Sequence, residues 1–298
     1  MEGANPNEAG TQQDAAGRAV AIVVDSTADL PPEQARALDI AVVPLIVRFG
    51  ERTFRDGVDL TPSAFLAELT ASTASPSTSQ PAVADFQTAF QTALDAGKDV
   101  VCLTIASQLS GTHNAARLAA EAVDPQGARV RVVDSGTVSG QLGLVAIEAA
   151  RAALAGASPD EIVAAVRSAL ARSQIYVVLE TLEYLQKGGR IGRAQALLGS
   201  VLSVKPIVTV QEGTVVPLER VRTWRKALDR IVELGREKAP LEALAIYHAG
   251  NPDDAKVLTD RLADLVPPDR LLLGEIGPVV ATYGGPGLVG IAPLAAVD

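Results

Sequence analysis

Four short runs of apolar residues in the first half of the chain restrict the fold more than any other feature. They span residues 19–24, 41–47, 100–105 and 130–133. Each is rich in Val and Ile and apolar on both faces, which is typical of strands in a parallel sheet that helices cover. Between the runs, apolar residues recur at helical spacing, as at Val83, Phe86 and Phe90. We therefore predict that residues 18–172 form a parallel α/β domain.

The second half of the chain shows a different pattern. Strands are predicted at residues 175–179, 204–210, 214–218, 243–247 and 271–276, and helices at 182–186 and 224–238. Residues 211–213 separate two of these strands and indicate a hairpin. We predict that residues 173–298 form an α+β domain with a mixed sheet, and that a ligand binds at or near the interface between the two domains.

Composition excludes several classes of function. The chain has 26 Lys and Arg against 35 Asp and Glu, a net charge of −9, so the whole molecule would repel a nucleic-acid backbone. Aromatic residues are only 3% of the chain, which leaves few rings for stacking on bases. Cys102 is the single cysteine and only His113 and His248 are histidines, so the sequence contains no zinc-binding cluster and we expect no metal.

The apolar runs and residues 1–17 predict the location of the protein in the cell. No run of about 18 apolar residues is present, so we expect no membrane span. Residues 1–17 are polar and unlike a signal peptide, which predicts a disordered leader and a cytoplasmic protein.

Residues 187–238 carry eleven Lys and Arg against five Asp and Glu. This stretch is either a solvated helix face or a surface for an anion or acidic partner.

Hydroxyl-rich segments precede four predicted helices. They are residues 25–29, 78–81, 107–112 and 134–137, and three of them follow a predicted strand. In an open parallel sheet the carboxyl ends of the strands meet at one edge, where helix amino termini attract carboxylates and phosphates. Each Ser or Thr could instead be a helix N-cap. A cap alone does not require Gly111, whose lack of a side chain allows a ligand to approach closely.

The sequence lacks the usual signatures of catalysis. It has no GxSxG elbow and no Walker loop, and no GxGxxG follows a strand. Neither histidine has an evident nucleophile beside it in the sequence, and both are interpreted as surface or internally satisfied residues. Hydroxyl groups without a general base suit ligand binding better than turnover.

Taken together, these segments resemble the DegV family, whose better-understood members are the FakB fatty-acid-binding proteins. The resemblance extends from about residue 19 to residue 294. The residues that carry it are Asp25-Ser26-Thr27-Ala28-Asp29-Leu30-Pro31, Thr78-Ser79-Gln80-Pro81, Leu109-Ser110-Gly111-Thr112, Asp134-Ser135, Lys187-Gly188-Gly189-Arg190-Ile191 and Gly285-Pro286-Gly287. The fold that the resemblance implies is α/β, a Rossmann-like parallel-sheet domain joined to a smaller α+β domain, with a fatty acid between or within them.

The resemblance also implies roles for single residues. The family's carboxylate contacts match Thr78 and Ser110, with the backbone near Gly111, and we add Ser79 to this group. Basic residues that engage a partner kinase match Arg190 and Arg222. Tyr283 stands where the family usually has a histidine, and a tyrosine is not a cation at neutral pH.

From this resemblance we expect a carrier that is not itself an enzyme. It would bind a long-chain fatty acid, need no cofactor, and present the carboxylate to a separate ATP-dependent fatty acid kinase that makes acyl phosphate for phospholipid synthesis. This expectation leaves room for transient contact with a membrane surface. Two alternatives stay open: a lipid-binding sensor or storage protein without a kinase, and an enzyme acting on a small molecule.

Overall fold

A four-stranded parallel sheet forms the first half of the protein. The computed structural model describes residues 18–72, 74–197 and 204–297, so the predicted disordered leader, residues 1–17, lies outside the described part. The strand order is β2–β1–β6–β7, and all neighbouring pairs are parallel. The bounds are β1 Val20–Asp25, β2 Ile40–Val43, β6 Asp99–Thr104 and β7 Val130–Asp134.

Helices cover both faces of this sheet. On one face lie α3 (Val83–Asp95) and α4 (Thr112–Val123). The buried Phe86 and Phe90 of α3 pack against the strands. On the other lie α5 (Ser139–Leu154) and α6 (Pro159–Arg172). Helix α6 begins with a capping box, in which the Ser158 hydroxyl accepts from the Glu161 N–H while the Glu161 carboxylate accepts from the Ser158 N–H.

A six-stranded mixed sheet forms the second half, in the order β10–β9–β8–β13–β11–β12. Its only parallel pair among the described strands is β11–β12. The bounds are β8 Tyr176–Val178, β9 Lys205–Gln211, β10 Thr214–Val221, β11 Leu241–His248, β12 Leu271–Glu275 and β13 Val289–Ala295. The hairpin predicted at residues 211–213 joins β9 to β10, and Glu212 and Gly213 both have positive φ, as a two-residue hairpin turn requires.

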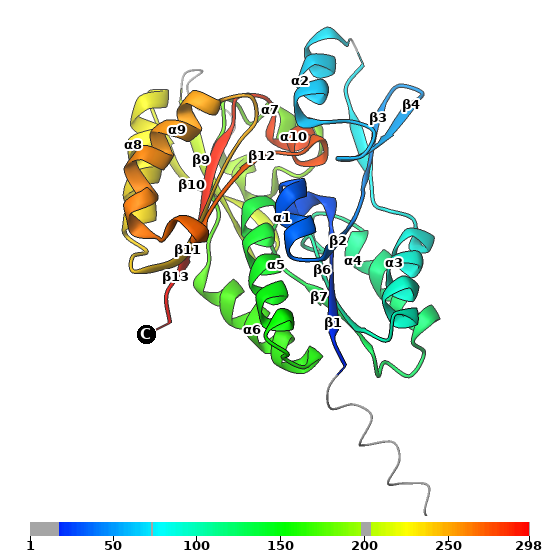
Figure 1. Cartoon of the computed structure of the whole chain (residues 1–298). Helices are drawn as coiled ribbons and strands as arrows, with labels where there is room; N and C mark the ends of the chain where they lie inside the picture. The colour runs from blue at the N-terminus through cyan, green and yellow to red at the C-terminus, as the bar shows by residue number, and fades with distance from the viewer. Residues whose placement is uncertain (1–17, 73, 198–203, 298) are drawn as a thin grey trace, which may run out of the picture.

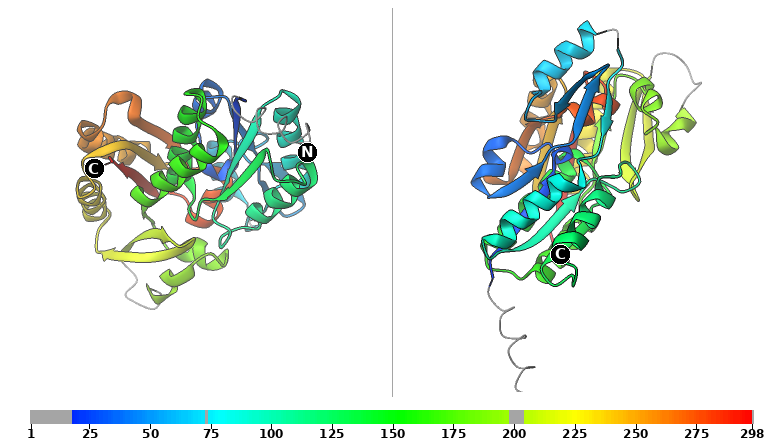
Figure 2. Two further views of the ribbon diagram at one scale, coloured as in Figure 1. Left: turned by 90° about the horizontal axis from the view of Figure 1, so that it is seen from below. Right: turned by 90° about the vertical axis from the view of Figure 1, so that its right-hand side faces the viewer.

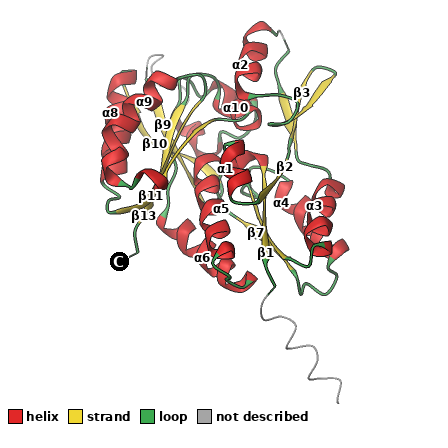
Figure 3. Ribbon diagram, in the orientation of Figure 1, coloured by secondary structure: helices red, strands yellow, loops and turns green. Residues whose placement is uncertain are grey.

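Two long helices cover the outer face of the six-stranded sheet. They are α8 (Trp224–Arg236) and α9 (Pro252–Leu262), at the left of Figure 1. Helix α5 packs on its inner face as well as on β1, so one helix is shared by the two sheets. Seen from below, the green helices α5 and α6 lie between the two halves (Figure 2). Figure 3 shows the resulting order of helix and strand layers. The predicted fold class is confirmed, and the division at residue 172 stays a prediction.

A small third sheet corrects one expectation. Residues 41–47 were predicted as a single strand, but the structure divides them between two sheets. Strand β2 ends at Val43, Pro44 interrupts the pairing because it has no N–H to donate, and β3 (Ile46–Phe49) begins a separate sheet. This sheet has the antiparallel order β4–β3–β5, with β4 at Arg52–Arg55 and β5 at Ser77–Ser79.

The remaining helical segments connect these layers. They are η1 Ser26–Ala28, α1 Pro32–Ala37, α2 Pro62–Ala71, α7 Glu183–Lys187, η2 Gly192–Leu197, η3 Ala263–Leu265, η4 Pro268–Arg270 and α10 Pro278–Gly284. Helix α10 contacts α2, β3, β5 and α7, so it lies where the third sheet meets the second half of the chain.

Candidate ligand-binding site

An aliphatic cavity lies between the third sheet, the β6–α4 loop, helix α10 and the inner face of the six-stranded sheet. It contains about 1140 Å³ of empty space, its open mouth included. The six-stranded sheet contributes Val177, Val208, Val210 and Ile291, and α10 contributes Val279 and Val280. A cavity with this lining suits an apolar ligand.

Thr78 and Tyr283 meet at the mouth of the cavity. Thr78 lies on β5, whose pairing with β3 places it opposite Val47. Its Oγ1 lies 2.6 Å from the hydroxyl oxygen of Tyr283, at the end of α10. One hydroxyl of this pair must donate to the other, which leaves the second with a free proton to donate. The neighbouring Ser79 also lines the cavity.

Arg190 closes the same side of the mouth. Its Nε donates to the Leu109 carbonyl at 3.2 Å and its Nη1 to the Gly188 carbonyl at 2.8 Å. The guanidinium carbon lies 5.0 Å from the centroid of the Tyr283 ring, a cation–π arrangement. A side chain at Gly188 would overlap this ring, so the glycine permits the packing of Tyr283.

Ser110 and Gly111 also line the cavity, next to the Leu109 carbonyl that accepts from Arg190. The Ser110 hydroxyl lies 2.8 Å from that of Thr112 and accepts from the Thr112 N–H, so it organises the turn as well as lining the cavity. Gly111 is the N-cap of α4, where no side chain caps the helix. A Cβ there would lie 3.2 Å from the Gln80 side chain. Gly111, at the positive end of the α4 dipole, lines the cavity, and this partial charge attracts an anion.

The segment Asp25–Asp29 has a different role. The Asp25 carboxylate accepts from the N–H and hydroxyl of Thr27 and from the Ile105 N–H, at 2.5 to 3.0 Å. The Asp29 carboxylate accepts from the Ser139 hydroxyl at 2.6 Å and from the Gly277 N–H at 2.9 Å. Neither aspartate lines the cavity. Asp25, and not a Ser or Thr, is the N-cap of η1, and the segment ties β1 to β6, α5 and the start of α10.

Asp56 is a buried acid that the sequence analysis missed. It follows β4, accepts from the Ser26 hydroxyl at 2.7 Å, and accepts from the Val279 N–H in the first turn of α10. Burial raises the pKa of Asp56 to about 7 and that of Asp25 to about 6, and it also raises the pKa of Asp29. In the sequence Asp56 lies in an ordinary polar turn, and only the fold places it close to the buried Asp25 and Asp29.

Residues 134–137 also satisfy one another. Asp134 accepts from the N–H groups of Ser107 and Gly136, and the Ser135 hydroxyl accepts from the Thr137 N–H. None of residues 134–137 lines the cavity. Of the four hydroxyl-rich segments, residues 78–81 and 107–112 thus contribute to the mouth and the other two brace the fold.

The two histidines lie away from the mouth. The His113 Nδ1 lies 3.1 Å from the Thr104 hydroxyl. His248 is half-buried, and burial lowers its pKa while Glu275 partly opposes that shift. Its Nδ1 makes no hydrogen bond with the described residues. His248 lines a separate open groove beside β2 and β12, where Asp29 and Asp56 also lie.

Arg222 is not part of the mouth. It is exposed, follows β10, and does not line the cavity. The structure therefore brings Arg190 and Tyr283 together with Thr78, Ser79, Ser110 and Gly111, and leaves Arg222 apart.

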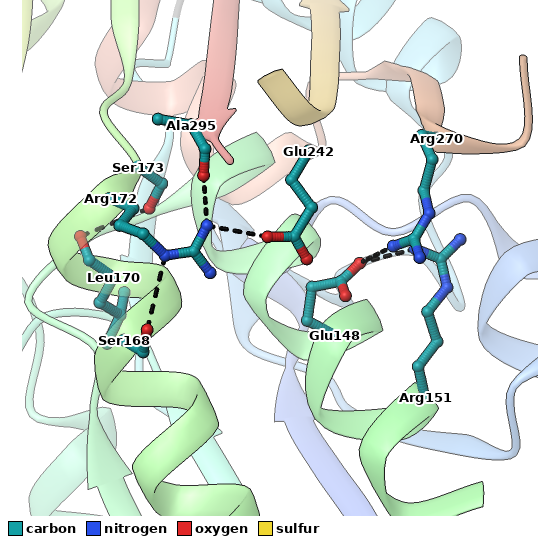
Figure 4. Close-up of polar contacts among 9 residues, drawn as sticks. All are labelled: Glu148, Arg151, Ser168, Leu170, Arg172, Ser173, Glu242, Arg270 and Ala295. Carbon is teal, nitrogen blue, oxygen red and sulfur yellow. Dashed lines mark hydrogen bonds and ion pairs between the residues drawn. The ribbon is translucent and has the colours of Figure 1, made fainter. Parts of the chain in front are cut away.

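Ion pairs join the two halves at the end of the six-stranded sheet. Arg172 of α6 donates to Glu242 on β11 at 2.8 Å and to the Ala295 carbonyl on β13 (Figure 4). Glu148 of α5 accepts from both Arg151 and Arg270, at 2.6 and 2.9 Å. Helices α5 and α6 are thereby fastened to the sheet that lines the cavity.

Tyr247 is a buried residue of the cavity wall that the sequence did not single out. It is 3% exposed, and its hydroxyl finds no hydrogen-bond partner among the described residues. Burial and the neighbouring Asp29 raise its pKa. Side chains at Gly140 and Gly274 would overlap its ring, so these glycines make the space that the ring fills.

The fold and this site define a class: an α/β protein with a parallel sheet, a mixed sheet and an aliphatic cavity whose mouth is lined by hydroxyl groups. The family model described as "Uncharacterised protein, DegV family" matches residues 19–296, and the chain belongs to the DegV family. A DegV domain-containing protein of Streptomyces coelicolor is 41% identical over 280 residues, covering 92% of this chain and 98% of the relative.

Two solved structures share the fold. A fatty-acid-binding DegV family protein from Thermus thermophilus superposes with a TM-score of 0.86 at 33% identity, covering 93% of this chain and all of that one (100%). A stearic acid-binding protein from Eubacterium ventriosum gives a TM-score of 0.82 at 26% identity, covering 92% and 97%.

The residues that the structure describes include no helix with the length and apolar character needed to cross a membrane. Their His, Cys, Asp and Glu side chains form no group of three that could hold a metal ion.

Proposed function

We propose that this protein binds a long-chain fatty acid, with the alkyl tail in the aliphatic cavity and the carboxylate at its mouth. The observation that carries the proposal is an aliphatic cavity with the hydroxyls of Thr78 and Ser110 and the open amino terminus of α4 at its mouth. Fatty-acid binding by structurally similar DegV proteins supports it.

Most of the affinity comes from the tail. Burying about 15 methylene groups at ~0.8 kcal/mol each gives on the order of 12 kcal/mol before the cost of ordering the chain. A hydrogen bond to a charged carboxylate contributes only about 1.5–3 kcal/mol. Thr78, Ser79, Ser110 and the backbone at Gly111 therefore set the orientation of the ligand, and the aliphatic walls hold it.

The carrier presents the carboxylate to a separate ATP-dependent fatty acid kinase in the cytoplasm. A carboxylate oxygen attacks the γ-phosphorus of ATP, the new O–P bond forms as the bond to the ADP oxygen breaks, and no proton is transferred. Neutral hydroxyl donors leave the carboxylate more nucleophilic than an arginine ion pair would. The protein contributes no cofactor and is not the enzyme; Arg222 and the exposed face of Arg190 engage the kinase.

The direct test is denaturing mass spectrometry of the purified protein, followed by titration with stearate. We expect a co-purifying long-chain acid, or tight binding of added stearate after its removal. A protein that carries no acid and does not bind stearate would contradict the proposal.

Kinase coupling is tested separately with Arg222→Glu. Because Arg222 lies away from the mouth, this variant should retain stearate and lose acyl-phosphate formation with the cognate kinase. Arg167→Glu, an equally exposed charge reversal on α6, is the matched control and should keep both properties. Undiminished acyl-phosphate formation by Arg222→Glu would remove its assigned role.

Tyr283 favours a second candidate, a lipid-binding sensor or storage protein that works without a kinase. A tyrosine cannot supply the positive charge that a histidine offers at this position. A genome that encodes no fatty acid kinase, together with no gain of acyl-phosphate formation by Tyr283→His, would select this candidate.

A further inference from the structure

A second cavity, which we call the vestibule, lies directly outside the mouth of the aliphatic cavity. It contains about 960 Å³ of empty space, counting the part open to solvent. The two cavities share three lining residues, Thr78, Arg190 and Tyr283. The hydroxyl pair and the guanidinium that face a ligand inside therefore form the inner wall of the vestibule.

The lining of the vestibule is positively charged and polar. Lys187 and Arg190 line it, and no Asp or Glu is among its described lining residues. Ser75, Ser77 and Tyr184 add hydroxyl groups. This composition differs from that of the aliphatic cavity and favours a small anion.

The two cations are held differently. Arg190 is fixed by two carbonyl groups and by the Tyr283 ring, so its position at the boundary is set before any ligand arrives. Lys187 pairs with Glu183 at 2.6 Å, and both side chains are exposed. Exposed pairs of this kind are weak, so Lys187 can turn from Glu183 towards an anion at little cost.

We propose that the vestibule is the binding site for the phosphoryl group of an acyl phosphate whose tail occupies the aliphatic cavity. This inference rests on the proposed function. The phosphorus of an acyl phosphate is bonded to a former carboxylate oxygen, so its other three oxygens must lie just beyond that head group. With the head group at Thr78, the space beyond the Thr78–Tyr283 pair is the vestibule. Lys187 is then a phosphate-binding residue.

The experiment compares two ligands with the same tail. One is stearate, and the other is the β-ketophosphonate analogue of stearoyl phosphate, in which CH₂ replaces the bridging oxygen and prevents hydrolysis. Their dissociation constants are measured on the full-length protein freed of lipid, for the wild type, Lys187→Gln and Lys226→Gln. Lys226 is an exposed lysine on α8 outside the vestibule, so its variant matches the change in net charge.

We expect Lys187→Gln to weaken the phosphonate about 5- to 10-fold and to change stearate less than about twofold. Lys226→Gln should leave both ligands within about twofold. The preference of the wild type for the phosphonate should fall as ionic strength rises. A second variant, Ser75→Trp, places bulk in the vestibule and should weaken the phosphonate while stearate still binds.

The outcomes distinguish a failure of the proposed function from a failure of the vestibule assignment. If the wild type does not bind stearate, the proposed function fails and the vestibule assignment fails with it. If stearate binds but Lys187→Gln behaves like Lys226→Gln, or if Lys187→Gln weakens both ligands equally, the vestibule assignment alone is overturned. Unchanged phosphonate binding by Ser75→Trp would also overturn it.

Discussion

Residues 25–29 and the mouth segments, residues 78–80 and 110–111, have different roles. All three segments contain hydroxyl groups and precede a helix. In the first segment, buried carboxylates receive the Thr27 hydroxyl and N–H groups from distant parts of the chain, at Ile105 and Gly277. At the mouth, the Thr78 hydroxyl pairs with another hydroxyl, that of Tyr283, beside the aliphatic cavity.

The difference lies in the partners and not in the residue types. Hydroxyl and carboxylate groups whose hydrogen bonds are completed by the fold contribute stability and are not available to a ligand. Hydroxyl groups that pair with one another keep one proton to donate. We therefore expect substitutions in residues 25–29 to change stability, and substitutions at the mouth to change ligand binding.

The largest effect should come from Asp25→Ala. This change leaves the N–H groups of Thr27 and Ile105 and the Thr27 hydroxyl buried without an acceptor, at about 1–3 kcal/mol each. We expect the free energy of unfolding in denaturant to fall by about 3 kcal/mol or more. Thr78→Ala is the contrasting variant and should lose less than about 1 kcal/mol. Equal losses in the two variants would contradict the assignment of stability to residues 25–29 and of ligand binding to the mouth.

The buried carboxyl groups predict the pH dependence of stability. The pKa of Asp56 rises from 3.8 to about 7 on folding and that of Asp25 to about 6, so the folded state binds more protons between these values. The free energy of unfolding should therefore be highest below about pH 4 and fall, by on the order of 3 kcal/mol for each of the two groups, as pH rises to 7.

Asp56→Asn should flatten this pH profile, because its side chain no longer ionises. Asp59→Asn is the control: Asp59 is exposed, and its hydrogen bonds with Arg55 lower its pKa. Denaturant unfolding at several pH values measures both variants. A profile for Asp56→Asn as steep as that of the wild type would show that Asp56 is ionised throughout.

At the mouth, the double variant Thr78→Ala and Ser110→Ala should bind stearate at least about 100-fold more weakly, because two hydrogen bonds to the carboxylate are lost, at about 1.5–3 kcal/mol each. Its stability should change little. Ser107→Ala, an exposed serine in the same loop as Ser110 and outside the cavity lining, should bind like the wild type. Unchanged affinity and head-group position in the double variant would remove the carboxylate assignment.

The smallest effect is expected for Tyr283→Phe. It removes the partner of Thr78 and keeps the ring under Arg190, so stearate binding should weaken about threefold to fivefold. Tyr184→Phe, a neighbouring tyrosine that does not line the aliphatic cavity, is the control and should show no change. If the two variants bind stearate equally, Tyr283 does not support the head group.

Much of the fold was accessible from the sequence because its signals are local. The apolar runs at residues 19–24, 100–105 and 130–133 became strands of one parallel sheet, and the hairpin turn at residues 211–213 was placed correctly. The failure at residues 41–47 is also local in origin. A continuous apolar run hid the division at Pro44, and the two parts belong to different sheets.

The site was only partly accessible. Thr78, Ser110 and Tyr283 were identified through a resemblance, and their positions 32 to 205 residues apart carry no signal that they lie together. Asp56 and Tyr247 gave no sequence signal, because each depends on partners from other elements. The separation of Arg222 from Arg190 likewise follows from the path of β9 and β10 and not from the charge pattern.

Local sequence patterns predict most strands of the two large sheets, and an aliphatic core, because periodicity and side-chain shape act over a few residues. The tertiary structure alone decided which hydroxyl groups were left for a ligand. That choice depends on whether the packing of distant strands supplies each polar group with a partner, and hydrogen bonds of this kind exist only once the chain has folded.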